Sequence, residues 1–173
     1  MKKNILIYGL ISGVLVAVLM AVNVSMCMKS GNYDGSILTG YAAMLLAFSL
    51  VFVCIKNYRD KYHAGIISFG KAFKMGLLIV LIASTIYVVA WLVEEQVFFP
   101  DFMEKYMAHE LSKLKDSNMS AAEIASRTAD LRHAQEMYSS PLIKILMTYA
   151  EILPVGLVVA LISSLILKRK VTG

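Results

Sequence analysis

The sequence is poor in charge, since Asp, Glu, Lys and Arg make up 17% of its 173 residues, against roughly 25% in soluble proteins. Hydrophobic residues make up 58%, and the mean hydropathy is +0.68. A water-soluble fold cannot bury so much apolar surface, and a disordered chain would not contain long apolar runs. The composition therefore excludes both classes and indicates a membrane protein.

Cysteine is also scarce, and its positions exclude a disulfide framework. Cys27 and Cys54 fall at the outer end of one apolar run and the inner end of the next, beyond the roughly 7 Å that bridged Cα atoms span. Neither has a metal-binding spacing. We expect both to be small apolar packing residues.

Enzymatic motifs are absent as well. The sequence contains no glycine-rich phosphate loop, nucleophile elbow or metalloprotease helix. Ser163 and Ser164 lie in an apolar stretch without a histidine to activate them. We therefore expect a non-enzymatic protein with no catalytic residue and no cofactor.

Four apolar runs are each long enough to cross a bilayer, which takes about 20 residues. They are residues 4–26, 36–55, 75–93 and 142–167. The first run is longer than the roughly 7–15 apolar residues of a cleaved signal and lacks its cleavage site, so we expect a retained helix. Uninterrupted runs also lack the alternation of a transmembrane barrel. The sequence predicts an all-α protein: a four-helix transmembrane bundle that forms one integral membrane domain over residues 1–173.

The distribution of cations predicts that both termini are cytoplasmic. One side of the predicted bundle holds a single acid, Asp60, and ten cations: Lys2, Lys3, Lys56, Arg59, Lys61, Lys71, Lys74, Lys168, Arg169 and Lys170. The other side holds six cations and ten acids. Because lysine and arginine are enriched on the cytoplasmic side of membrane proteins, the cation-rich side is expected to face inward. The same split explains the sequence pI of about 9.2 without a nucleic-acid partner.

Small residues recur at helical spacing within the spans. Gly9, Gly13, Ala17 and Ala21 follow one another every four residues in the first span. The fourth span has the same four-residue spacing of small residues, at Gly156, Ala160 and Ser164. Lipid offers no hydrophobic drive between helices, so close packing depends on such residues. We expect these faces to pack within the chain rather than between two chains.

The segment 94–141 is predicted to form an extracytoplasmic hairpin of two amphipathic helices. The first helix follows Pro100 and carries apolar residues on one face: Met103, Met107, Leu111 and Leu114. The second begins at a capping box of Ser120 and Glu123 and ends before Pro141. The hairpin either packs its apolar faces together or lies on the bilayer. It is either a structured cap or a docking surface for a partner.

The inner loop between residues 56 and 74 is expected to anchor to lipid headgroups. Its five cations are Lys56, Arg59, Lys61, Lys71 and Lys74. A cation near an anionic membrane surface contributes about 1 kcal/mol. Ser68 is placed to cap the third span early.

A candidate polar site lies near the outer surface of the predicted bundle. Glu151 is the one acid well inside a span, on the same helical face as Lys144 and Thr148. It lies 17 residues from Lys168, or about 25 Å along a helix, which is the outer part of the apolar core. Asn23, Glu94 and Glu95 fall at a similar level.

Two interpretations of that site remain open. Asn23, Glu94, Lys144 and Glu151 together would line an outward-facing vestibule that binds a cation or a proton. In the plainer interpretation, Glu151 pairs with Lys144 or reaches the interface.

A zinc site in the outer hairpin is the weaker of two interpretations of its histidines. His109, His133 and Glu136 would approach one another in an antiparallel hairpin. Without cysteines or a helical two-histidine motif, solvated polar faces explain these residues better. We therefore expect no metal.

Several blocks of the sequence resemble a known family. They are residues 40–48, 55–60, 69–76 and 87–91, and Tyr58-Arg59-Asp60 and Gly70 to Gly76 are the most specific parts. The chain resembles, over nearly its whole length, a bacterial membrane family filed as domain of unknown function 4199. This resemblance implies the four-span layout with a helical outer insert, in a bacterial cytoplasmic (inner) membrane. The family has no established activity, so it implies no site residue.

Two functions from different classes are compatible with these features. The first is a scaffold or accessory subunit for a membrane protein partner, or a homo-oligomer, acting through the outer hairpin and the small-residue faces. The alternative is a small transporter or channel subunit, or a lipid-handling protein, with its polar site near Glu151. The absence of an internal repeat pair argues against a complete transporter in one chain.

Overall fold

The computed structural model describes residues 1–62 and 64–169, without the side chains of residues 35 and 36. Six helices make up most of this part of the chain: α1 (Lys2–Ser30), α2 (Asp34–Tyr62), α3 (Phe69–Val97), α4 (Phe102–Lys115), α5 (Ala121–Tyr138) and α6 (Pro141–Leu167). No strand forms within it. A single backbone bridge joins Ile67 to Arg169, whose N–H donates to the Ile67 carbonyl at 2.9 Å.

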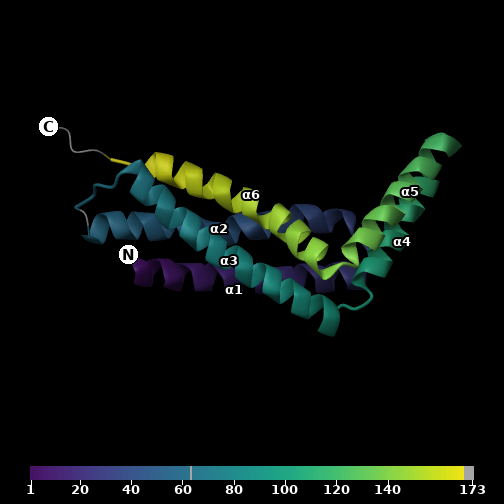
Figure 1. The fold of residues 1–173 in the computed structure, drawn as a ribbon, viewed down its shortest axis with the longest axis horizontal. Helices are drawn as coiled ribbons and strands as arrows, with labels where there is room; N and C mark the ends of the chain where they lie inside the picture. The colour runs from purple at the N-terminus through teal and green to yellow at the C-terminus, as the bar shows by residue number, and fades with distance from the viewer. Residues whose placement is uncertain (63, 170–173) are drawn as a thin grey trace.

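Four of the helices are long and apolar enough to cross a membrane: α1, α3, α6 and residues 37–62 of α2. They lie alongside one another as a bundle, and the start of α1 and the end of α6 are at the same end of it (Figure 1). The short helices α4 and α5 form an arm at the opposite end. The predicted all-α, four-helix architecture with a helical hairpin between the third and fourth spans is confirmed.

The helices extend beyond the predicted spans, and this corrects the expected inner loop. Instead of a loop over residues 56–74, α2 continues to Tyr62 and α3 begins at Phe69. Hydropathy detects only the part of a helix inside the hydrocarbon core. Lysine and arginine are good helix formers, so both helices continue into the interface. Ser68 caps α3 as predicted, because its Oγ accepts a hydrogen bond from the Lys71 N–H at 3.4 Å.

The cations expected at lipid headgroups divide into two groups at this end of the bundle. Lys56, Lys61 and Lys74 are exposed. Arg59 is half-buried, bonded to Asp60 at 2.7 Å and donating to the Leu167 carbonyl at 3.4 Å. Lys71 lies over the Tyr58 ring, 5.3 Å from its centroid. The exposed three are free to meet headgroups, while the other two also hold the protein together. Lys170 lies outside the described residues.

The small-residue faces pack within the chain, as predicted. Helix α1 packs against α2 and α3, and α6 packs against the same two helices, so α1 and α6 are diagonal in the bundle. Gly9 and Gly13 of α1 face Ile82 and Ile86 of α3. Gly76 of α3 meets α6, and Gly156 of α6 meets α3 and α2.

Adding one methyl group at Gly156 is expected to destabilise the bundle. A Cβ there would lie 2.4 Å from Val80 Cγ1 and 2.9 Å from Phe48 Cζ, so both side chains must shift. Overpacking of this kind costs about 1–3 kcal/mol. We expect Gly156→Ala to lower the unfolding temperature in detergent. Gly70→Ala is the control, since a Cβ at Gly70 meets nothing within 4 Å. Equal unfolding temperatures for the two variants would contradict the packing.

The two helices of the predicted hairpin, α4 and α5, pack against each other, as the first of the two predicted arrangements expects. Met107 of α4 is buried, and Ile124 and Leu131 of α5 are half-buried, while no residue of α5 is fully buried. The predicted capping box is present: Ser120 Oγ accepts from the Glu123 N–H at 3.3 Å, and a Glu123 oxygen accepts from the Ser120 N–H at 2.9 Å. The arm leaves the bundle at an angle (Figure 1).

Candidate functional site

A cavity of about 460 Å³ lies in the half of the bundle next to the arm. This volume is within the roughly 300–1,000 Å³ of small-molecule sites. All four long helices line it, and α4 covers it with Phe102, Met103 and Tyr106. Its lining is mostly apolar and aromatic, and Tyr138 at the end of α5 completes it.

Glu151 is the one charged residue among those described as lining the cavity. Its side chain is exposed there, and within the described part of the chain nothing forms a hydrogen bond or ion pair with its carboxylate. The neighbouring Thr148 instead donates its hydroxyl to the Lys144 carbonyl at 2.8 Å. The site therefore presents one unpaired carboxylate in an apolar wall.

Two further polar side chains face the same cavity. Asn23 of α1 lines it, and its Oδ1 accepts a hydrogen bond from Thr39 at 2.6 Å. Tyr87 of α3 is only 6% exposed, yet its hydroxyl bonds to no residue in the ranges that the structure describes. Since Tyr87 lines the cavity and its hydroxyl has no partner among the described residues, this hydroxyl is available to a molecule in the cavity.

The four residues of the predicted polar site are only partly brought together. Asn23 and Glu151 line the cavity, whereas Glu94 and Lys144 do not. Lys144 forms an ion pair with Glu95 rather than with Glu151, and its Nζ lies 4.9 Å from the centre of the Tyr138 ring. The orientation of α3 explains why Lys144 pairs with Glu95 and not with the adjacent Glu94. Consecutive helical residues point about 100° apart, so only one of these two glutamates faces α6.

Aromatic side chains at the ends of the predicted spans hold the arm over the cavity. Tyr33, between α1 and α2, is 5% exposed and contacts the rings of Phe102, Tyr106 and His109, with centroids 5.2–6.1 Å apart. Trp91 contacts Phe102 edge to face at 5.5 Å and donates its indole N–H to the Tyr138 hydroxyl at 2.6 Å. Their one signal in the sequence is their place at the ends of the spans.

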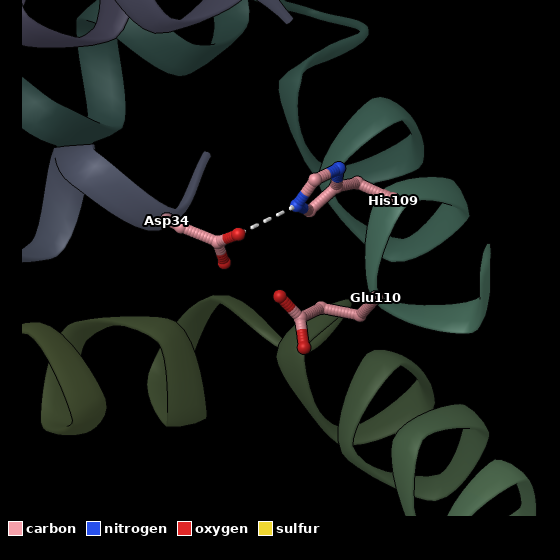
Figure 2. A group of neighbouring side chains, drawn as sticks. All are labelled: Asp34, His109 and Glu110. Carbon is pink, nitrogen blue, oxygen red and sulfur yellow. Dashed lines mark ion pairs between the residues drawn. The ribbon is translucent and has the colours of Figure 1, made fainter. Parts of the chain in front are cut away.

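A charged cluster ties the arm to the bundle at a second point. Asp34 at the start of α2 faces His109 and Glu110 of α4 (Figure 2), with ligand atoms within 4.8 Å of one another. These oxygen and nitrogen atoms are a possible zinc ligand set. Lys113 already supplies a cation there, since its Nζ lies 2.5 Å from Asp34 Oδ1 and 3.8 Å from Glu110 Oε1. The cluster is therefore described best as an ion pair between helices.

The residues of the weaker zinc interpretation are not gathered at one place. His109 belongs to this cluster, but His133 and Glu136 are exposed on α5 and are not part of it. Asp34, which is the bundle's contribution to the cluster, was missed because it is 79 residues from Lys113 in the sequence.

We expect the exposed Asp34–Lys113 pair to make docking of the arm depend weakly on pH. A hydrogen bond from Lys113 lowers the pKa of Asp34 from its ordinary 3.8, and the same bond raises the pKa of Lys113 from 10.5. Above pH 3.8 the pair therefore contributes fully to the stability of the docked arm. This contribution is lost as the pH falls through the lowered pKa of Asp34. At basic pH, the contribution of the pair to the stability of the docked arm is complete below pH 10.5 and is lost as the pH rises through the raised pKa of Lys113.

The one tryptophan of the chain reports on this docking. Trp91 touches Phe102 of the arm, so its fluorescence is expected to shift to the red as acid below pH 3.8 weakens the Asp34 contact. In Asp34→Asn the emission should already be shifted at neutral pH. Any change in emission that this variant still shows in acid measures the effect of the other titrating groups. An unchanged acid step in Asp34→Asn would contradict the assignment.

Comparison with known proteins identifies one family. Residues 7–169 match the model of a family described as "Protein of unknown function (DUF4199)", in agreement with the resemblance seen in the sequence. No curated protein and no solved structure matches the chain.

Proposed function

The chain belongs to the family of proteins of unknown function DUF4199, and we propose that it is a membrane protein that binds a small amphipathic molecule without catalysis. The observation that carries this proposal is the cavity of about 460 Å³ with the unpaired carboxylate of Glu151 in its wall. An apolar cavity with a few polar groups that point into it is the usual form of a small-molecule site. A transporter or channel subunit, or a lipid-handling protein, would need such a site.

The lining favours binding over chemistry. Nucleophilic catalysis requires a nucleophile beside a general base. The described residues around the cavity include no histidine or lysine, and the Thr148 hydroxyl is already bonded to a backbone carbonyl. Glu151 bonds to no nucleophile among them. We therefore propose a non-enzymatic role, since catalysis at this site would need a general base or nucleophile from another molecule.

We place the protein in a bacterial cytoplasmic membrane with both termini inside. The cation-rich end of the bundle, where Lys56, Lys61 and Lys74 are exposed, supports this orientation. The cavity then lies in the outer leaflet and the arm lies outside. The exposed lysines would contact anionic headgroups on the inner face.

Filling the cavity tests the proposal. A Cβ at Gly40 would meet only Asn23 Nδ2, at 3.6 Å, so a larger side chain there has room to enter the cavity. We expect the wild-type protein, purified in mild detergent, to retain a small molecule that mass spectrometry detects. Gly40→Leu should lose this molecule while its unfolding temperature stays within a few degrees of the wild-type value measured after ligand removal.

The matched control is Gly70→Leu, at the other end of the bundle, where nothing lies within 4 Å of an added Cβ. It should retain the molecule. If Gly40→Leu and Gly70→Leu retain the same molecules as the wild type, the cavity is not the binding site and the proposal is wrong.

A scaffold or accessory subunit is the second candidate, and α5 favours it. No residue of this 18-residue helix is buried, and the arm projects from the bundle (Figure 1). We rank it second because the apolar faces of α4 and α5 cover each other, which leaves less apolar surface for a partner than the sequence indicated. A membrane protein that co-purifies at fixed ratio, and is lost when exposed α5 residues are changed, would reverse the order.

A further inference from the structure

The mouth of the cavity lies between α2 and α6. Its lining residues with large exposed fractions come from these two helices: Ile37 at 57%, Tyr41 at 44% and Met147 at 46%, together with the exposed Glu151. The lining residues of α3, Tyr87 and Trp91, are 6% and 7% exposed. α4 covers the cavity from above. A molecule therefore enters sideways.

This direction of entry selects lipophilic molecules. Glu151 lies about 25 Å and Met147 about 31 Å along α6 from Lys168, so the mouth opens at the outer edge of a core about 30 Å thick. The ends of the lipid chains next to the headgroups surround a bundle at that depth. A molecule that enters sideways there comes from the outer leaflet, where lipophilic and amphipathic molecules concentrate.

The charge of the lining selects a cation. Glu151 is the single charged residue described around the cavity, and a carboxylate in an apolar wall is costly until a positive charge pairs with it. The ammonium group of Lys144, seven residues before Glu151 on the same helix, is already paired with Glu95. An anionic headgroup or a phosphate would find no cation in the lining.

The aromatic groups of the lining fit an organic cation in particular. Tyr41 and Tyr87 share the cavity with Trp91 and Glu151, and aromatic faces attract cations that lie within about 6 Å of a ring. Met20, Met44 and Met147 offer flexible thioether surfaces that adapt to irregular apolar shapes. An inorganic divalent cation prefers several oxygen ligands, whereas this lining supplies one carboxylate.

We propose that the cavity binds a lipophilic organic cation, which enters from the outer leaflet between α2 and α6 and places its positive charge beside Glu151, with its apolar groups against the aromatic and methionine side chains. The inference rests on the proposed binding function and names the chemical class of the ligand.

Two ions of the same shape and opposite charge test the class of ligand. Tetraphenylphosphonium and tetraphenylborate both carry four phenyl groups. Binding of each to the full chain in detergent is measured by equilibrium dialysis, with empty micelles as the blank. We expect saturable binding of the phosphonium at one site per chain and none of the borate. Glu151→Gln should weaken phosphonium binding at least about tenfold, which is about 1.4 kcal/mol.

Three variants of the full chain make the result specific to the site. Glu151→Asp keeps the negative charge and should retain most of the binding. Glu136→Gln makes the same charge change on the exposed face of α5 and should bind as the wild type does. Gly40→Leu should remove binding, because it fills the space that the phenyl groups need.

The outcomes separate this inference from the proposed function. Equal binding of both ions, lost in Gly40→Leu, would overturn the choice of a cation and leave the cavity as a binding site. Phosphonium binding that Glu151→Gln does not change would overturn the role of Glu151. If neither ion binds and the wild type retains no molecule, both proposals fail.

Discussion

Replacing Lys144 by methionine is expected to lower the free energy of unfolding by about 3–5 kcal/mol, the usual cost of breaking a buried ion pair. The side chains of Lys144 and Glu95 are only 15% and 11% exposed. Methionine matches the length of the lysine stem but leaves the Glu95 carboxylate without a cation. The loss of helical circular dichroism during titration with a denaturing detergent measures the effect.

A double variant separates this cause from lost packing. Lys144→Met combined with Glu95→Gln removes both charges, so most of the lost stability should return. Glu151→Gln serves as the control, because Glu151 is outside the pair and its loss leaves Lys144 and Glu95 bonded. If Lys144→Met alone costs less than about 1 kcal/mol, as exposed pairs do, the pair is not buried in the folded protein.

Trp91→Ala is expected to destabilise the protein by about 3 kcal/mol or more and to release the arm, since truncation of a buried aromatic residue typically costs about 3–5 kcal/mol. The ring is 7% exposed, contacts Phe102 of α4 and bonds the Tyr138 hydroxyl at the end of α5. Its removal breaks both contacts and enlarges the cavity. Hydrogen exchange that is faster than in the wild type in α4, but unchanged in α1, would show the release.

Trp91→Phe distinguishes the ring from its hydrogen bond. Phenylalanine keeps the contact with Phe102 but cannot donate to Tyr138, so we expect a loss of about 1 kcal/mol. An arm that exchanges at the wild-type rate in Trp91→Ala would show that the contacts of Tyr33 and Asp34 suffice to hold it.

Much of the fold is predictable because it depends on local patterns. Hydropathy locates the four long helices, and the capping box of Ser120 and Glu123 places the start of α5. The glycine spacing indicated packing within the chain, and Gly13 and Gly156 do meet neighbouring helices. Helix ends were less predictable, since hydropathy falls at Lys56 while backbone hydrogen bonding continues to Tyr62.

The site was less predictable because it depends on how the helices are rotated. Depth along the helices placed Asn23 and Glu151 at one level, and both line the cavity. Depth does not show which way a side chain points, so the choice of Glu95 over Glu94 or Glu151 as the partner of Lys144 could not be derived. The contacts of Tyr33 and Asp34 with α4 join residues far apart in the sequence, and no local pattern reveals them.

The order of the helices along the chain has a consequence for biogenesis. α6 is the last helix to be synthesised, and it supplies both Lys144, the partner of Glu95, and Glu151. Until α6 leaves the ribosome, the Glu95 carboxylate near the end of α3 has no Lys144 to pair with, and the future cavity has no wall on that side. Insertion of α6 is therefore expected to neutralise the Glu95 carboxylate and to enclose the cavity in the same step.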